Sequence, residues 1–159
     1  MAFFQTLFGK ILVTFLISMV PVIELRGGIP YGIAQGLDPW VAYVASVLGN
    51  MVPVPFILLF IRRILRWMTR YPRLERIARR LEDRAKRKSA RVQKSELVGL
   101  CVLVAIPLPG TGAWTGALVA ALMDMRLKRA IPTTFVGVLI AGLLVALACS
   151  GVKALRFLV

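Results

Sequence analysis

Pro107-Leu108-Pro109-Gly110-Thr111-Gly112-Ala113-Trp114 lies in the middle of an uncharged run from Leu97 to Met123. The run is long enough to cross a bilayer, which takes about 20 apolar residues. Its centre cannot form a regular helix, because two prolines lack a backbone N–H and two glycines favour a turn. We therefore predict two half-helices, Leu97–Ile106 and Gly112–Met123, joined by a loop. At membrane depth such a loop must be buried in protein or line a cavity, and we interpret it as a re-entrant hairpin that forms half of a binding site.

The composition indicates an integral membrane protein. Of the 159 residues, 58% are hydrophobic, and the mean hydropathy is +0.79, whereas soluble domains have about 45–50% apolar residues. The sequence contains no histidine, which argues against catalytic triads and imidazole metal sites, so we expect no enzyme, no cofactor and no metal. Cys101 and Cys149 lie in apolar runs, and we interpret them as buried apolar side chains rather than as a disulfide.

The net charge of +14 is concentrated in one segment. Two thirds of the 21 lysines and arginines lie between Arg62 and Lys94, with apolar sequence on both sides, so we expect no nucleic-acid binding. Apolar residues recur at helical spacing from Leu74 to Leu81. The segment therefore predicts a basic amphipathic helix on the anionic cytoplasmic leaflet, and a solvated arm is the alternative. The arginines predicted to contact anionic lipid are Arg73, Arg76, Arg80, Arg84, Arg87 and Arg91.

A second broken segment precedes the basic helix. The apolar run Ile11–Ile23 is too short to span a bilayer and is followed by Glu24-Leu25-Arg26-Gly27-Gly28-Ile29-Pro30. We predict a half-helix, a loop over Glu24–Pro30 and a second half-helix over Tyr31–Leu37, which places both charges at a hairpin tip. Ionisable residues within a membrane are costly and usually mark a substrate or proton path. A mutual pair of the two charges that only holds the loop is the alternative.

Each predicted hairpin is followed by a full span. Pro39–Ile61 and Ala130–Val152 are uncharged and long enough to cross a bilayer. The first span carries Asn50 at its centre, followed by two prolines that release backbone carbonyls from the helix. The sequence therefore predicts an all-α integral membrane protein built as an inverted repeat, in which residues 1–61 and 97–159 each form a re-entrant hairpin plus a transmembrane helix.

Lysines and arginines gather on the cytoplasmic side of membrane proteins, so the basic linker of residues 62–96 is predicted to be cytoplasmic. A hairpin over Leu97–Met123 returns to the cytoplasm and keeps Arg126, Lys128 and Arg129 there, whereas a full span would place them outside. The alternative fold is a bundle of four kinked spans. Small residues at four-residue spacing predict that the two hairpins pack closely on each other; they are Gly28, Gly32, Gly36, Gly112, Gly116 and Ala120.

The candidate site lies where the hairpin tips meet. Thr111 is placed to cap the half-helix that begins at Gly112, and the free N–H groups of such a helix end attract anions. With Arg26 opposite, the site would hold a phosphate or carboxylate, and Glu24 would gate it or couple protons; a cap without a ligand is the alternative. Trp114 is expected to contact an apolar tail or to fill the hairpin interface. The predicted site residues are Glu24, Arg26, Pro30, Asn50, Pro107, Pro109, Gly110, Thr111, Gly112 and Trp114.

The residues of three stretches, Glu24–Ala34, Leu48–Phe56 and Ile106–Ala117, resemble the signatures of the small multi-drug export protein family. The resemblance covers nearly the whole chain and implies export. The architecture is more distantly similar to the DedA (VTT-domain) membrane proteins, which implies paired re-entrant hairpins and transbilayer movement of lipids such as polyprenyl phosphates. Arginines near the second-hairpin proline are usual in DedA proteins, and Pro107–Trp114 contains none. The chain does not resemble the four-helix small multidrug resistance exporters.

Three functions are compatible with the sequence. The first hypothesis is a small transporter in the cytoplasmic membrane that moves an amphipathic, anionic or lipid-like substrate and couples this to protons; Arg26 and the positive helix end favour it. The second is a proton-coupled exporter of lipophilic cationic drugs with Glu24 as the counter-charge, and the third is a non-transporting membrane scaffold. The expected partners are membrane lipids, a small amphipathic substrate and a second copy of the chain, because two hairpins and two spans enclose little volume.

Overall fold

The described part of the chain consists of helices. A computed structural model describes residues 6–68, 95–108 and 111–158, and every regular element in these ranges is an α-helix. The all-α prediction is therefore confirmed for the described residues. The helices are α1 (Leu7–Met19), α2 (Glu24–Ala34), α3 (Pro39–Met51), α4 (Pro53–Met68), α6 (Ser95–Ala105), α7 (Ala113–Leu122) and α8 (Leu127–Leu158).

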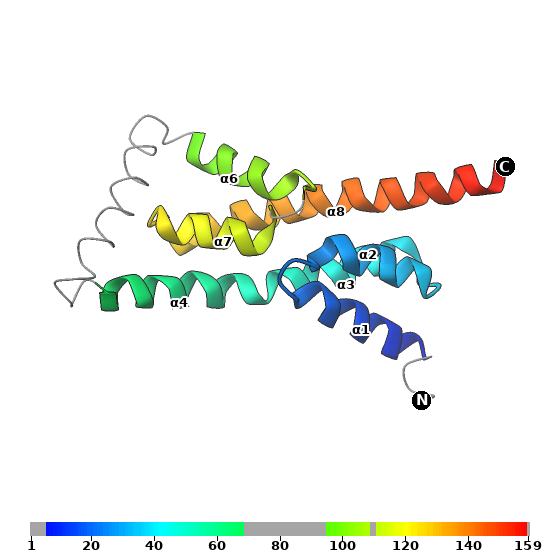
Figure 1. Ribbon diagram of the computed structural model, residues 1–159, viewed down its shortest axis with the longest axis horizontal. Helices are drawn as coiled ribbons and strands as arrows, with labels where there is room; N and C mark the ends of the chain where they lie inside the picture. Colours follow the sequence, from blue (N-terminus) through cyan, green and yellow to red (C-terminus); the bar gives the residue numbers. More distant parts are fainter. Residues whose placement is uncertain (1–5, 69–94, 109–110, 159) are drawn as a thin grey trace.

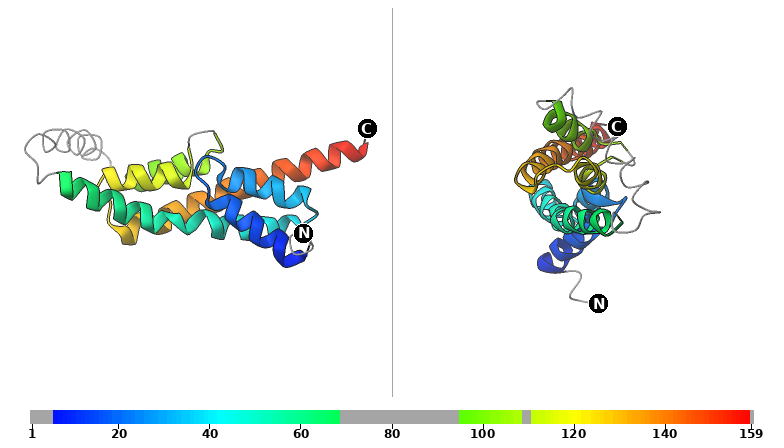
Figure 2. Two further views of the ribbon diagram at one scale, coloured as in Figure 1. Left: turned by 60° about the horizontal axis from the view of Figure 1, so that its bottom comes forward. Right: turned by 90° about the vertical axis from the view of Figure 1, so that its left-hand side faces the viewer.

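Two helical segments of the described chain, Pro39–Ile64 and Leu127–Gly151, are long and apolar enough to cross a membrane. The first consists of α3 and most of α4, which join at Val52, a residue with helical backbone angles. Pro53 begins α4 without turning the chain, because proline is tolerated in the first turn of a helix. Both predicted spans are therefore confirmed as helices, and they run along the length of the molecule (Figure 2).

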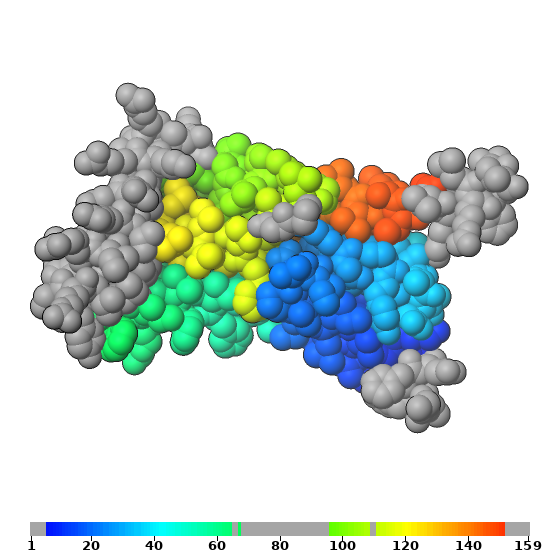
Figure 3. Space-filling model, viewed as in Figure 1, coloured from blue at the N-terminus to red at the C-terminus, as the bar shows by residue number. Residues whose placement is uncertain are grey.

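The remaining described helices form two pairs, α1 with α2 and α6 with α7. The pairs lie toward opposite ends of the long axis, and the loops that connect their helices meet in the middle (Figure 1). Figure 3 shows the pairs as two adjoining blocks, blue and yellow-green. The second pair agrees with the sequence prediction, because α6 and α7 differ by at most two residues at either end from the predicted half-helices Leu97–Ile106 and Gly112–Met123.

The first pair breaks earlier than the sequence predicts. α1 ends at Met19 and α2 begins at Glu24, so the predicted loop over Glu24–Pro30 is wrong, and these residues form the first turns of α2. The chain reverses around Pro21, where the preceding Val20 is extended, as is usual before proline. Val22 and Glu24 then adopt positive φ angles, which non-glycine residues rarely do.

Two glycines of α2 serve helix packing rather than a turn. A methyl group at Gly28 would lie 2.8 Å from Ser46 Oγ and would overlap Ser18 Oγ, and one at Gly32 would lie 2.9 Å from Ala42 Cβ. The missing side chains let α2 pack closely between α1 and α3, as small residues do in membrane helices. This packing explains why the glycines do not break the helix.

α2 and α7 end in the same way. Leu37 and Met125 each donate their N–H, at 3.0 Å, to the carbonyl five residues earlier, and the residues before them, Gly36 and Asp124, have positive φ. This is a Schellman motif, a common helix terminator. Leu37 precedes the first residue of α3 by as many residues as Met125 precedes the first residue of α8. One constant spacing along the chain therefore relates the two halves, and we call two residues at this spacing a matched pair.

Gly49 and Gly137 are a matched pair with the same packing role. A methyl group at Gly49 would overlap the carbonyl of Phe15 in α1, and one at Gly137 would lie 2.9 Å from the carbonyl of Cys101 in α6. Each glycine therefore lets a long helix approach the backbone of the short helix that begins its half of the chain. Phe15 and Cys101 consequently occupy corresponding places.

The small-residue stripes do not join the two hairpins, and that prediction is wrong. Gly28 and Gly116 are a matched pair, and Gly116 faces Val104 of α6 as Gly28 faces Ser18 of α1. Apart from Gly112, which lies against Glu24, the glycines of the stripes that contact other helices do so within their own half of the chain. The predicted alignment, which placed Gly28 opposite Gly112, is shifted by one helical turn, because the first turn of α2 was assigned to a loop.

The predicted basic linker, residues 62–96, is described only at its ends. Its first residues continue α4 to Met68, and its last two, Ser95 and Glu96, begin α6, so both boundaries of the linker move inward. Residues 69–94 lie outside the described residues, and the basic amphipathic helix stays a prediction. This part contains Arg73, Arg76, Arg80, Arg84, Arg87 and Arg91.

Candidate functional site at the hairpin tips

Where the loops meet, the start of α2 lies beside the end of α6 and the start of α7. A helix leaves N–H groups unpaired at its start and carbonyls unpaired at its end. Lipid offers no partner for these groups. Two charged residues in the first turn of α2, Glu24 and Arg26, supply the partners from the other half of the chain.

Glu24 binds the start of α7. Its Oε1 accepts a hydrogen bond from the backbone N–H of Trp114 at 3.2 Å, and the side chain is only 4% exposed. The residue before a helix commonly provides this acceptor from its own side chain. Gly112 occupies that position in α7 and has no side chain, so Glu24 caps α7 from a different helix. The helix dipole stabilises a negative charge at this place.

Arg26 binds the opposite helix end. Its Nη2 donates to the Ile106 carbonyl at 3.0 Å and to Thr111 Oγ1 at 2.9 Å, and its Nη1 donates to the Leu108 carbonyl. Ile106 directly follows α6, so the guanidinium lies at the end where the dipole favours positive charge. We call the bonds of Glu24 and Arg26 to residues 106–114 the tip contacts.

Thr111 does not cap α7, and this prediction is wrong. Its hydroxyl donates to the carbonyls of Ile106 and Leu108, at 2.8 and 2.9 Å, and thereby closes the loop onto itself. The cap position belongs to Gly112, whose φ of 143° is one that glycine alone adopts readily. The expected placement of Arg26 opposite the start of α7 is also corrected, because Arg26 lies at the end of α6 and Glu24 lies at the start of α7.

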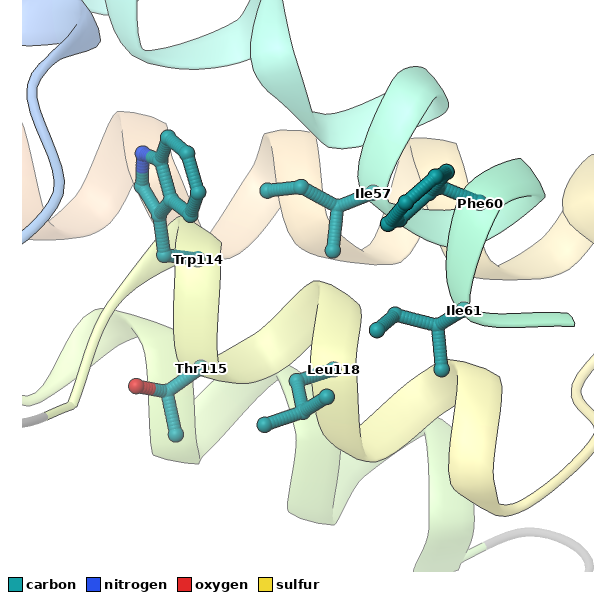
Figure 4. A pocket seen from close by; sticks show the side chains of 6 residues that line it. All are labelled: Ile57, Phe60, Ile61, Trp114, Thr115 and Leu118. Atoms are coloured by element: carbon teal, nitrogen blue, oxygen red, sulfur yellow. The ribbon is translucent and has the colours of Figure 1, made fainter. Parts of the chain in front are cut away.

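Trp114 links the tips to an apolar groove. Its indole Nε1 donates to the carbonyl of Met19, the last residue of α1, at 3.2 Å. Its ring lies at one end of a groove of about 290 Å³ between α4 and α7 (Figure 4). The side chain thus contacts the end of α1 and also lines the groove, so the two sequence interpretations of Trp114 both stay open. The other residues that line the groove are Ile57, Phe60, Ile61, Thr115 and Leu118.

Trp114→Phe is expected to lower the free energy of unfolding by about 1 kcal/mol, because phenylalanine keeps a ring in the groove but cannot donate to Met19. Thermal unfolding of the detergent-purified protein would measure this change. Trp40→Phe is the matched control, since Trp40 is 66% exposed and stacks on Tyr43. Equal losses for the two variants would show that the bond to Met19 contributes nothing.

The other predicted site residues are spread more widely. Pro30 lies inside α2, one turn beyond Arg26. Pro107 is exposed in the loop after α6, and Asn50 is fully buried in α3. Pro109 and Gly110 lie outside the described residues.

Sequence reasoning missed three backbone acceptors at the tips, the carbonyls of Ile106 and Leu108, which bind Arg26, and that of Met19, which binds Trp114. Every residue has a carbonyl, so no sequence signal marks these three. It also missed the buried hydroxyl of Ser46. A signal existed in that case, because Ser46 lies one helical turn before Asn50 and shares its face of α3.

Comparison with known protein families identifies the family of the chain. A family model described as "Putative small multi-drug export protein" matches residues 24–144. The chain belongs to this family. The match to the small multi-drug export family begins at Glu24, the first residue of α2, and includes the loop between α6 and α7; together with the two apolar helices it identifies a membrane protein. A search of curated proteins and a search of solved structures each found no match.

Proposed function

We propose that this protein is a small transporter of the cytoplasmic membrane that moves an amphipathic substrate between two re-entrant hairpins. In this proposal the two halves form an inverted repeat whose tips meet near the bilayer midplane. The recurrence of the Schellman motif and of the packing glycines in matched pairs supports the repeat. The opposed direction of the two helix pairs supports the inversion (Figure 1).

The observation that carries the proposal is the pair of tip contacts. The ionisable side chains of Glu24 and Arg26 bind backbone atoms of the other half of the chain, rather than groups in their own half. Charged groups at membrane depth are expensive. Contacts of this kind form and break when one half moves against the other, so they are suited to gate a central site.

The substrate in this proposal is anionic or lipid-like. Glu24 occupies the anion-attracting start of α7, and an anionic head group competes with it for that helix end and for Arg26. Protonation of Glu24 removes its charge and favours this exchange, which couples transport to protons. The groove beside Trp114 is lined by apolar side chains and accommodates an apolar tail.

The family description names multi-drug export, and our second candidate is the export of lipophilic cationic drugs. Here Glu24 is the counter-charge, and a cationic substrate draws it away from Trp114. The two candidates share the gate and differ in the sign of the charge that they move. Both place the predicted basic linker, residues 62–96, on the cytoplasmic side, with its amphipathic helix against anionic lipid, and both use a dimer of the chain.

Proteoliposome transport assays with Glu24→Gln and Arg26→Ala test the proposal. With a fluorescent polyprenyl-phosphate-like lipid as the probe, we expect wild type to move the lipid between leaflets and each variant to lose at least about nine tenths of the rate, because one lost charged hydrogen bond corresponds to about tenfold or more. Lys128→Gln, which removes an exposed charge at the start of α8, is the control and should retain the rate.

The outcomes separate the candidates. Movement of a lipophilic cation but not of the lipid, with loss in Glu24→Gln, would establish the second candidate and contradict the first. If wild type moves neither probe, or if both tip variants transport like Lys128→Gln, then the tips do not gate transport. A scaffold would then be the better account of the chain.

A further inference from the structure

Two buried polar side chains of α3 take no part in the tip contacts. Asn50 and Ser46 are both 0% exposed, and the Asn50 amide oxygen, the Asn50 amide nitrogen and Ser46 Oγ have no hydrogen-bond partner among the described residues. An unpaired buried polar group destabilises a fold by about 1–3 kcal/mol. Buried polar groups in native proteins are nearly always paired, so these two need an explanation.

They belong to a line of polar groups that follows the glycines of α2. Ser46 Oγ and Ser18 Oγ crowd Gly28 from α3 and from α1. One turn along, Thr14 Oγ1 lies 3.1 Å from the position of a methyl group on Gly32. We call Thr14, Ser18, Ser46 and Asn50 the polar seam; the side chains of all four are 0% exposed.

The polar seam leads to Glu24. α2 and α3 run in opposite directions, with Gly32 against Ala42 and Gly28 against Ser46. One further turn in each helix brings Glu24 level with Asn50. At the other end of the seam, the Lys10 ammonium donates to the Gln35 carbonyl at 2.7 Å on the surface. The seam therefore connects the Lys10 end of the molecule with the tip contacts.

The second half of the chain packs in the same way with apolar side chains at three of the four corresponding places; at the fourth, Thr134 is the matched partner of Ser46, is 0% exposed and has no hydrogen-bond partner for its hydroxyl among the described residues. Val104 and Leu100 of α6 face Gly116, where Ser18 and Thr14 face the glycines of α2. Asn50 forms a matched pair with Val138, which is fully buried. Close packing of the helices does not require the polar side chains of Thr14, Ser18 and Asn50, since apolar ones serve at the corresponding places of the other half. The polarity of the seam points to a separate role.

The chemistry of the seam fits water better than a metal cation. Asn50 needs both a donor and an acceptor, and a cation would satisfy only its oxygen. The hydroxyls of Thr14 and Ser18 already donate to the carbonyls of Lys10 and Thr14, both at 2.8 Å, and keep lone pairs that accept from water. Side chains one turn apart are separated by about 5–6 Å, which one bridging water spans.

We propose that the polar seam holds a file of water molecules that carries protons between the Lys10 end of the molecule and Glu24. A hydronium ion at the Lys10 end gives up one proton, each water in the file breaks one O–H bond as it forms another, and the last proton converts the Glu24 carboxylate to the neutral acid, so that Trp114 loses a charged acceptor. Arg26 is the charged neighbour of Glu24; α3 and α7 carry no charged residue, α1 carries only Lys10, and the described charged side chains of α8 lie in its first turn. The inference rests on the proposed proton coupling and supplies its route.

The test follows proton arrival without any substrate. In the background Trp40→Phe and Trp67→Phe, Trp114 is the remaining tryptophan, and its fluorescence reports the state of Glu24. After a stopped-flow acid jump on the proteoliposomes, we expect Asn50→Val to slow the fluorescence change at least about tenfold and to leave its final amplitude unchanged, because the file is interrupted at its last step. Glu24→Gln should abolish the change.

Two control measurements separate a blocked proton route from a change in folding. Asn50→Val installs the residue of its matched position, so its melting temperature should equal or exceed that of wild type, and a slow response then cannot be attributed to misfolding. Thr134→Val, which alters the matched partner of Ser46 outside the seam, should respond at the wild-type rate. A wild-type rate in Asn50→Val, an equal slowing in Thr134→Val, or no pH response of Trp114 in the wild-type background would each overturn the proposal.

The transport assay and the acid-jump measurement together distinguish a failure of this inference from a failure of the proposed function. If no probe is transported but Trp114 responds to the acid jump through the seam, the proton route stands and the transport proposal fails. If transport depends on Glu24 and Arg26 but Asn50→Val leaves the response unchanged, the transporter stands and the route through the seam fails.

Discussion

Gly112→Ala is expected to disable the tip contacts and to lower the free energy of unfolding by about 3 kcal/mol. Two effects act together. At a φ of 143° a side chain is strained wherever it points. The new methyl group would also overlap the Glu24 carboxylate, which must then leave the start of α7 and remain buried without its partner. Thermal unfolding in detergent and the lipid-transport assay would both measure the damage.

A double-mutant cycle isolates the second effect. In a Glu24→Ala background the carboxylate is gone, so Gly112→Ala should cost only the strain of the backbone, and the two substitutions should be non-additive by about 1–2 kcal/mol. Additive losses would mean that the carboxylate does not lie against Gly112. The cycle therefore tests the geometry of the site independently of any substrate.

Gly49→Ala is expected to destabilise the fold by about 2–3 kcal/mol. Its methyl group would overlap the Phe15 carbonyl, and a backbone atom within a helix cannot rotate away as a side chain can. α1 would have to move as a whole and would lose its contact with α3. The free energy of unfolding in detergent is the measurement.

Gly99→Ala is the control for this substitution. Gly99 lies in α6 with no atom near the place of a new methyl group, so alanine there should stabilise the helix by up to about 1 kcal/mol. Gly137→Ala, at the matched position of Gly49, should destabilise like Gly49→Ala. Similar stabilities for Gly49→Ala and Gly99→Ala would contradict the close approach of α3 to α1.

The second helix pair could be predicted from sequence because its signals are unambiguous. Pro107 and Gly112 lie close together in a long uncharged run. A loop is the conformation that accommodates both the missing N–H of the proline and the turn preference of the glycine. The first pair was misplaced because Gly28 has two possible uses, a turn or a close helix contact. Which use applies depends on Ser18 and Ser46, and those neighbours are known only once the helices are packed.

The charged residues of the candidate site could be predicted from the sequence, whereas the groups that they bind could not. Glu24 and Arg26 stand out as charges within apolar sequence, and the structure brings both to the hairpin tips. Thr111 was assigned to the wrong helix end because a hydroxyl near a helix start usually caps it. Here the hydroxyl donates to a loop carbonyl and accepts from Arg26, and the distance of Arg26 along the chain means that this partner has no local signal.

The tip contacts also constrain how the protein is made. Glu24 and Arg26 leave the ribosome well before residues 106–114, which supply their partners. Until then, the membrane offers nothing to pair these charges. If the helix pairs are re-entrant as we propose, we expect the first pair to reach its final position only after residues 106–114 have been synthesised. Biogenesis, like the folded site, requires both halves of the chain.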